Sequence, residues 1–235
     1  MSESARRAEI IDGLKASFPV VVSSAPFGML FGALAVKNGL TIGESVAMSA
    51  TVYAGASQMV GIELFGKSIA PWLVVLSIFA VNFRHVLYSA SVGRRLAQWP
   101  ALARWAGFFF LVDPQYAEAE RRGEQGLPVS PAWYFAMAAP IYVFWFIDTW
   151  IGATFGALIK DPHGLGLDFL LPLYFLGMVM GFRQRPLWLP IVAASGVASV
   201  VAWHVVGSPW HVSIGALAGV ALAALLAPDP GRPFA

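Results

Sequence analysis

The sequence predicts an all-α, polytopic transmembrane helical bundle with about seven or eight spans. Hydrophobic residues make up 58% of the 235 residues and charged residues only 12%, whereas a soluble domain carries about a quarter charged residues. The apolar residues also gather in long runs, and a helix needs roughly 20 of them to cross a bilayer. Seven or eight such spans would use nearly the whole chain and leave no room for a soluble domain of ordinary size.

The candidate spans follow one another with short connections. They cover residues 18–36, 45–64, 69–92, 102–118, 132–159, 167–182, 187–206 and 209–227. The fourth is the weakest, because it contains Arg104 and Asp113 and its apolar core is too short to span alone, so it is expected either to cross or to be re-entrant or interfacial. Residues 1–17 are expected to form a cytoplasmic amphipathic lead-in, 18–227 the transmembrane domain, and the proline-rich 228–235 a flexible tail.

The charged residues argue against several other classes of protein. The formal net charge is +2 and the pI is near 9.0, but the basic residues form no stripe, so nucleic acid is not an expected partner. Cysteine is absent, which excludes disulfides, thiolate metal sites and cysteine nucleophiles. The mixed charges of residues 1–15 differ from those of a cleavable signal peptide.

Lysine and arginine set the expected orientation, because cytoplasmic connections carry an excess of both. With eight crossings and a cytoplasmic N-terminus, the inside collects Arg6, Arg7, Lys15, Lys67, Arg121, Arg122, Arg183, Arg185 and Arg232. The outside collects Lys37, Arg94, Arg95, Arg104 and Lys160. The arginines at 94, 95 and 104 fit poorly on the outside. We therefore expect eight crossings, or seven with a re-entrant element that keeps the same sides.

An internal repeat is one interpretation of two similar segments, 28–34 and 152–158. A chance match in a chain rich in glycine and alanine is the other. If the fourth candidate span crosses, the repeats would be parallel; if it does not, they would be inverted. Four Gly-x-x-x-Gly patterns begin at Gly28, Gly152, Gly177 and Gly215, and for most of them ordinary internal helix packing is the better interpretation.

A proline in the middle of the first candidate span suggests a broken helix. Pro26 removes a helical hydrogen bond and leaves carbonyl groups near Val22 free. In lipid, these groups must be satisfied by protein, water or substrate, and broken helices form the binding sites of many transporters. Pro26 and Gly28 are therefore candidate substrate-binding residues. A kink satisfied by Ser23 or Ser24 is the alternative.

Small and polar residues gather at the centre of the second candidate span. Gly55 weakens the helix there, while Tyr53, Ser57 and Gln58 bring hydrogen-bonding groups to membrane depth. Unwound backbone, a hydroxyl and an amide would suit the ammonium and carboxylate of an amino acid without a buried charge. The alternative is that Gln58 joins helices through hydrogen bonds.

Charged residues inside the candidate spans complete the predicted site. Asn82 and Arg84 lie late in the third span, and a buried arginine suggests a substrate carboxylate, an acidic partner or snorkelling to the interface. Because a histidine side chain ordinarily changes its charge near neutral pH, His85 is a candidate for proton coupling. Asp113 and Asp148 are the candidate counter-ions or proton carriers. Neither a metal nor a cofactor is expected.

The motifs together resemble the AzlC family of bacterial branched-chain amino acid permeases, the large subunits of two-component exporters. The matching stretches are Pro26-Phe27-Gly28 with Phe31-Gly32, Met48-Ser49 leading to 52–58, the Asn82-Phe83-Arg84-His85 stretch to Ser89, and 166–172. The resemblance implies export of hydrophobic amino acids such as valine, leucine and isoleucine from a bacterial inner membrane. It also implies a small membrane partner of the AzlD type. Where the family usually shows an Asp-Glu pair, this chain has Asp113-Pro114.

Other functions are less well supported by the sequence. The zinc-protease pattern His-Glu-x-x-His and the Gly-x-Ser-x-Gly elbow of serine hydrolases are both missing, so we expect no enzyme. An intramembrane aspartyl site made of Asp113 and Asp148 has no supporting motif. Without a nucleotide-binding loop, we expect a secondary carrier driven by a proton gradient, for amino acids or for another small solute.

Overall fold

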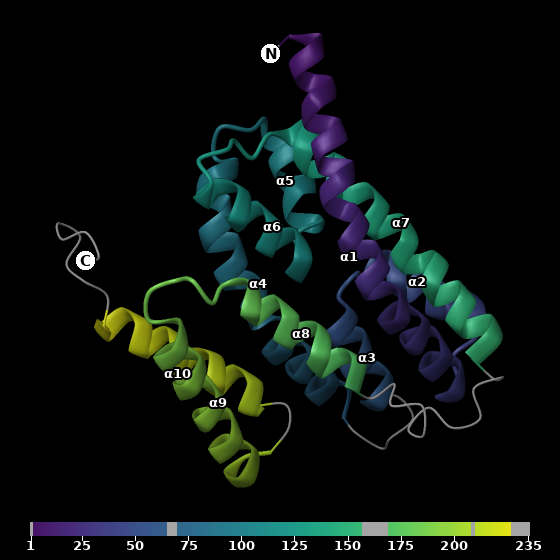
Figure 1. Cartoon of the computed structure of the whole chain (residues 1–235). Helices are drawn as coiled ribbons and strands as arrows, with labels where there is room; N and C mark the ends of the chain where they lie inside the picture. Colours follow the sequence, from purple (N-terminus) through teal and green to yellow (C-terminus); the bar gives the residue numbers. More distant parts are fainter. Residues whose placement is uncertain (1, 65–69, 157–168, 208–209, 227–235) are drawn as a thin grey trace. The chain divides into compact units, whose positions relative to one another are not determined.

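The computed structural model describes residues 2–64, 70–156, 169–207 and 210–226, and these form helices joined by short connections (Figure 1). The chain divides into two compact units, Met1–Ser68 with His85–Tyr174 and Ile69–Arg84 with Phe175–Ala235. The helices are α1 (Glu3–Lys37), α2 (Ile42–Thr51), α3 (Gly55–Leu64), α4 (Pro71–Leu96), α5 (Ala101–Phe109), α6 (Asp113–Glu124), α7 (Pro131–Phe155), α8 (Leu170–Gly181), α9 (Trp188–Val205) and α10 (Trp210–Leu226).

Four of these helices, α1, α4, α7 and α9, are long and apolar enough to cross a membrane, and α10 is a shorter apolar helix. The predicted class, an all-α membrane helical bundle, is therefore confirmed. The predicted lead-in continues without a break into the first span, because α1 begins at Glu3. The predicted tail, 228–235, lies outside the described residues.

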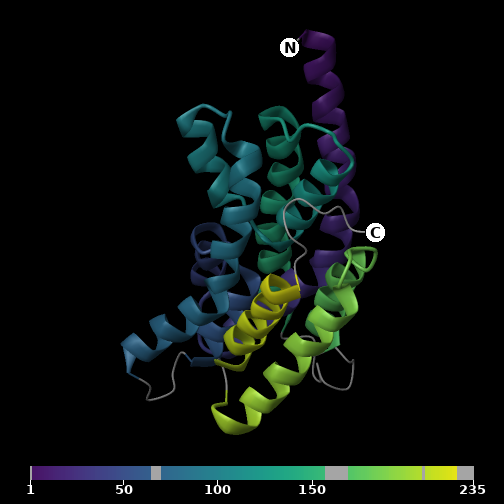
Figure 2. The ribbon, with the colours of Figure 1, turned by 90° about the vertical axis from the view of Figure 1, so that its left-hand side faces the viewer.

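Helices α1 and α7 form the scaffold of the first unit and lie side by side in both views (Figures 1 and 2). Their backbones approach so closely that a Cβ atom on Gly32 would overlap the carbonyl of Thr149, and one on Gly152 would overlap that of Met29. Residue numbers rise along both helices in the same order, so the helices are parallel. Two of the Gly-x-x-x-Gly patterns therefore serve internal packing.

The predicted break of the first helix is wrong. Helix α1 passes through both Pro19 and Pro26. The hydroxyl groups of Ser23 and Ser24 donate to the carbonyls of Val20 and Val21, at 3.1 and 3.3 Å. Close packing against α7 then keeps α1 continuous despite the missing proline donor.

The chain reverses instead inside the second candidate span, which forms two short helices of 10 residues each. Tyr53 lies between them with φ 42°, in the left-handed region. As α3 advances from Gly55 to Ile62, its neighbours on α1 advance from Phe27 to Phe31, so α3 is parallel to α1 and α2 is antiparallel. We call α2 and α3 the first hairpin. The expectation that residues 45–64 cross as one helix is therefore wrong.

The fourth candidate span forms a second hairpin, made of α5 and α6. Helix α5 has 9 residues and α6 has 12, which gives lengths of roughly 13 and 18 Å, too short to cross. Tyr88 and Arg95 of α4 bond Asp113 and Glu120 of α6 in the same order along both helices, so α6 is parallel to this part of α4. This segment therefore turns back between α5 and α6, which corresponds to the predicted re-entrant alternative.

Because the first hairpin turns back, the end of α4 returns to the same end of the first unit as the N-terminus. Arg95 bonds Glu120, and Arg122 bonds Glu9 and Asp12, all at that end. The expected outside position of Arg94, Arg95 and Arg104 is therefore wrong, and the poor fit of their charges disappears. Residues 28–34 and 152–156 also run parallel, not inverted, because the second candidate span does not cross either; residues 157 and 158 of the second segment lie outside the described residues.

The second unit contains an antiparallel pair formed by α9 and α10. A Cβ on Gly215 would meet Ser199, and one on Gly219 would meet Ser195 and Ile191, so this glycine pattern also serves internal packing. His211 lies against the ring of Trp203, with the centroids 4.8 Å apart. The glycines of the remaining pattern, Gly177 and Gly181 in α8, have no such neighbour within 4 Å among the described residues.

Candidate functional site

The tips of the two hairpins meet beside the middle of α7. The ring centroid of Tyr53, at the first tip, lies 4.8 Å from that of Tyr142 on α7 and 6.2 and 6.4 Å from those of Phe109 and Phe110 at the second tip. The Tyr142 ring also contacts Phe109 and Phe110, at 5.8 and 5.3 Å. These four residues are named the tip cluster. They fill the space between the hairpins with aromatic rings.

The backbone at the first tip is held by a tyrosine of the scaffold. The hydroxyl of Tyr142 donates to the carbonyl of Ala50 at 2.8 Å, a group near the end of α2 where helical partners run out. Gly55, which begins α3, has no room for a side chain, because a Cβ would lie 2.7 Å from the Phe27 ring and 2.9 Å from Trp145. At Gly55, where the sequence predicted a weakened helix, α3 packs closely against α1 and α7.

Gln58 belongs to a closed ring of hydrogen bonds between the first hairpin and α7. The indole of Trp145 donates to Oε1 of Gln58 at 3.1 Å. The Nε2 of Gln58 donates to the hydroxyl of Ser49 at 3.0 Å. Ser49 lies 2.7 Å from the hydroxyl of Thr149, which donates to the Trp145 carbonyl at 2.8 Å. Thr149 has only one hydrogen, so Ser49 must donate to it.

Both ends of the Gln58 amide are therefore occupied, and the side chain is fully buried. These contacts correspond to the alternative in which Gln58 joins helices. Its role in binding substrate stays a prediction, as does that of Ser57, which is also fully buried. Pro26 lies on the exposed face of α1, away from this ring.

Asp148 lies in a tight site between α1 and α7. It is 6% exposed, and a Cβ on Gly28 would lie 2.8 Å from its own Cβ. Among the described residues its Oδ2 atom has no hydrogen-bond partner. A charged carboxylate in such a place is costly. The structure therefore brings two predicted residues, Gly28 and Asp148, together.

Tyr88, which the sequence analysis did not single out, connects two of the residues predicted to couple protons, His85 and Asp113. The hydroxyl of Tyr88 donates to Oδ1 of Asp113 at 2.9 Å, and the ring of His85 lies 5.5 Å from that of Tyr88. Asp113 is the first residue of α6, directly after the second tip. Asn82 and Arg84 are half-buried on the part of α4 that belongs to the other unit, and their place in the site stays a prediction.

Gln115 is a further buried amide that sequence reasoning missed. It is fully buried in the first turn of α6. Its Nε2 donates to the carbonyl of Tyr134 at 3.0 Å, and its Oε1 has no hydrogen-bond partner in the described part of the chain. One signal was present: Gln115 follows Phe110 by five positions, as Gln58 follows Tyr53.

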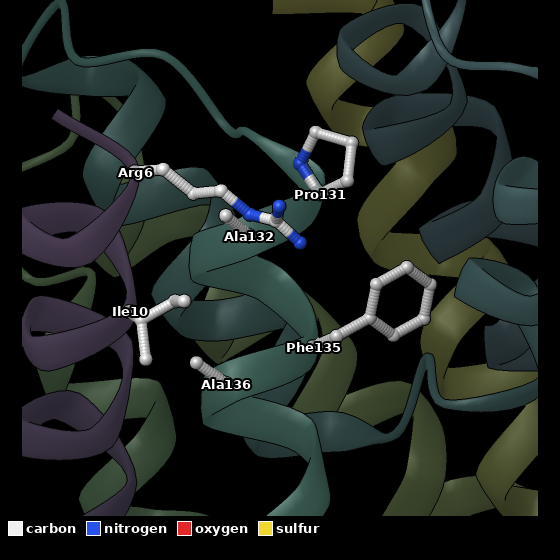
Figure 3. Close-up of a pocket in the computed structure, with 6 residues that line it drawn as sticks. All are labelled: Arg6, Ile10, Pro131, Ala132, Phe135 and Ala136. Carbon is white, nitrogen blue, oxygen red and sulfur yellow. The ribbon is translucent and has the colours of Figure 1, made fainter. Parts of the chain in front are cut away.

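A pocket of ≈ 550 Å³ opens between the start of α1 and the start of α7 (Figure 3). Arg6 and Ile10 of α1 face Pro131, Ala132, Phe135 and Ala136 of α7. None of the predicted site residues lines this pocket, and its walls are apolar apart from Arg6. It lies at the charged end of the unit, not at the tip cluster.

Comparisons with known proteins find one family model and several membrane proteins that are similar to this chain. The family model described as AzlC protein matches residues 19–159. The chain is 31% identical to the inner membrane protein YgaZ of Escherichia coli over 194 residues, which cover 80% of this chain and 78% of the relative. An uncharacterized membrane protein of Archaeoglobus fulgidus is 25% identical, with 91% and 92% covered, and one of Helicobacter pylori is 26% identical, with 79% and 85% covered. No solved structure matches.

Proposed function

Because this chain belongs to the AzlC protein family, we propose that it is a secondary transporter that exports branched-chain or other hydrophobic amino acids. It acts as the large subunit of a two-component permease, together with a small membrane subunit of the AzlD type. One observation carries the proposal: two discontinuous hairpins enter the first unit from opposite ends and meet at Tyr142. Discontinuous helices near the bilayer midplane form the substrate sites of many transporters.

Substrate binds where the hairpin tips meet, and the tip cluster separates the two ends of the pathway. Both α3 and α6 begin at a tip, so their N-terminal ends present backbone N–H groups and the positive end of the helix dipole to the substrate carboxylate. The aromatic rings around Tyr53 and Tyr142 give the apolar side chain of the substrate a matching surface. Withdrawal of one hairpin at a time gives access first from one end and then from the other.

Asp148 is the proposed proton carrier, with His85 and Asp113 as further coupling groups. Its buried carboxyl group lacks a hydrogen-bonding partner at Oδ2 in the described part of the chain, so a proton or a cation has to accompany it. The variant Asp148→Asn keeps the shape of the side chain and removes its titration. It should abolish the pH dependence of transport, and an unchanged pH dependence would remove Asp148 from this role.

The basic end of the first unit is proposed to face the cytoplasm of a bacterial cell. The N-terminus, the end of α4 and the second hairpin bring Arg6, Arg7, Arg94, Arg95 and Arg122 to this end, as the positive-inside rule requires. The first hairpin then opens toward the outside and the second toward the cytoplasm.

The proposal is tested by efflux of preloaded radiolabelled leucine from cells that express the chain, with and without the small partner. Efflux that needs both proteins and that isoleucine or valine inhibits supports the two-component exporter. The matched variant is Tyr142→Ala, which removes the ring shared by both tips and should abolish coupled efflux. If leucine, valine, methionine and aromatic amino acids all stay in the cells while both proteins are in the membrane, the proposed substrate class is wrong.

A further inference from the structure

We propose that Gln115 forms a subsite for the primary ammonium group of the substrate, with its Oε1 as the hydrogen-bond acceptor. The proposal rests on the transport of amino acids proposed above. Fully buried amide oxygens without a partner are uncommon in proteins, and each one calls for an explanation. In the described part of the first unit, Gln115 combines complete burial with an open acceptor at a hairpin tip.

The orientation of the Gln115 amide follows from its neighbour. Its nitrogen lies 3.0 Å from the carbonyl oxygen of Tyr134, and a backbone carbonyl can only accept a hydrogen bond. The nitrogen must therefore face Tyr134, and the oxygen is the atom left over. Tyr134 is itself fixed, because its hydroxyl donates to the carbonyl of Gly107 at 2.8 Å. The open acceptor is thus held in place by α5 and α7.

The corresponding amide of the first hairpin, Gln58, shows what a glutamine with both ends of its amide occupied looks like here. Gln58 uses both ends of its amide, with Trp145 donating to it and Ser49 accepting from it. Gln115 uses only the donor end. The difference leaves an acceptor in the second hairpin that a ligand with an N–H group would satisfy.

The position of Gln115 selects an α-amino acid among N–H donors. It lies in the first turn of α6, where Pro114 has no N–H group and that of Tyr116 bonds the Val112 carbonyl, which leaves the N–H groups of Asp113 and Gln115 without a carbonyl partner within the helix. These N–H groups suit a carboxylate, while Oε1 suits an ammonium group, and an α-amino acid carries both on one carbon atom.

The test is leucine transport in proteoliposomes with the small partner, comparing the wild type, Gln115→Leu and the control Gln125→Leu. Gln125 is exposed at the end of α6. Competitors are unlabelled leucine and 4-methyl-2-oxopentanoate, which has the same side chain and no ammonium group. We expect Gln115→Leu to raise the leucine KM about 10- to 100-fold, the range for a hydrogen bond to a charged group. It should also lose the preference for leucine over the oxo acid.

An unchanged KM and preference in Gln115→Leu would overturn the subsite while leaving the proposed function intact. If Gln115→Leu does not fold, Gln115→Met takes its place, because a flexible thioether fills the same volume. If the wild type moves no hydrophobic amino acid, the proposed function fails. In that case, the thermal stabilisation of the wild type and of Gln115→Leu by leucine and by isopentylamine tests the subsite on its own. Equal stabilisation of the two proteins, or stabilisation of neither, overturns the subsite.

Discussion

The two hairpins have similar shapes and are anchored in different ways. The first hairpin is tied to α7 near its tip by neutral hydrogen bonds, those of Gln58 and the bond from Tyr142 to Ala50. The second is tied mainly at its base by charges. There Glu120 bonds Arg95 and Ser91, and Arg122 bonds Glu9 and Asp12. Its tip keeps an open acceptor at Gln115.

The two kinds of anchor, hydrogen bonds at a tip and ion pairs at a base, determine where each hairpin is able to move. Neutral hydrogen bonds inside a bilayer have no water to replace them, so the tip of the first hairpin is costly to detach. Ion pairs fix the base of the second hairpin, while its tip is held by ring contacts and by separate hydrogen bonds, from Tyr88 to Asp113 and from Gln115 to the Tyr134 carbonyl, and not by a closed ring of them. On this comparison, we infer that the second tip is the one that moves in the proposed transporter.

The largest expected effect is on the stability of the first hairpin. Gln58→Leu leaves the indole of Trp145 and the hydroxyl of Ser49 without their partners, so the free energy of unfolding should fall by about 2–4 kcal/mol. Gln115→Leu removes one hydrogen bond and one unpaired acceptor, so its cost should be about 1 kcal/mol or less. Denaturant unfolding in detergent measures both. Equal losses would mean that the two tips are anchored alike.

A smaller effect is expected at the base of the second hairpin. The side chain of Arg122 is 8% exposed, and those of its partners Glu9 and Asp12 are 19% and 55% exposed. Arg122→Met should therefore cost about 1–3 kcal/mol, less than a fully buried pair. Arg121 is the control, because its side chain is 59% exposed, and Arg121→Met should cost at most about 0.5 kcal/mol. If the two substitutions cost the same in urea unfolding, the base is not an anchor.

The smallest expected effect concerns the single hydroxyl that ties the first tip to α7. Tyr142→Phe keeps the ring contacts of the tip cluster and removes the bond to Ala50, so it should cost about 1 kcal/mol. Ser23→Ala, which removes an exposed hydroxyl from α1, should change stability by about 0.5 kcal/mol or less. Thermal melts followed by circular dichroism compare the two. A larger loss for Ser23→Ala would contradict the view of α1 as a continuous scaffold.

Composition and apolar runs were enough to predict the membrane helical class, because they follow directly from the bilayer as solvent. The same approach misjudged Pro26, since a proline signals a lost hydrogen bond but not whether packing against a neighbouring helix keeps the helix continuous. It identified Tyr53 and Gly55 as a weak point but not as a reversal. The reversal depends on contacts with Phe27 and Trp145, far away in the sequence.

Parts of the site were predicted for similar reasons. Gly28 and Asp148 were both expected and lie together. Gln115 was missed because a polar residue after an Asp-Pro pair is typical of a helix start at the membrane surface. Only the direction of α5 and α6 brings it to the interior.

The position of Tyr142 has a consequence for the energy stored across the membrane. Its ring touches both tips, and its hydroxyl holds the backbone of one of them. Withdrawal of either tip removes contacts from this one side chain, while the other tip continues to pack against it. Withdrawal of both would strip the ring of all these partners at once and open a continuous route for ions. Such a leak is therefore the most costly arrangement of the hairpins, and in the proposed exporter the gradient is protected by a residue that carries no charge.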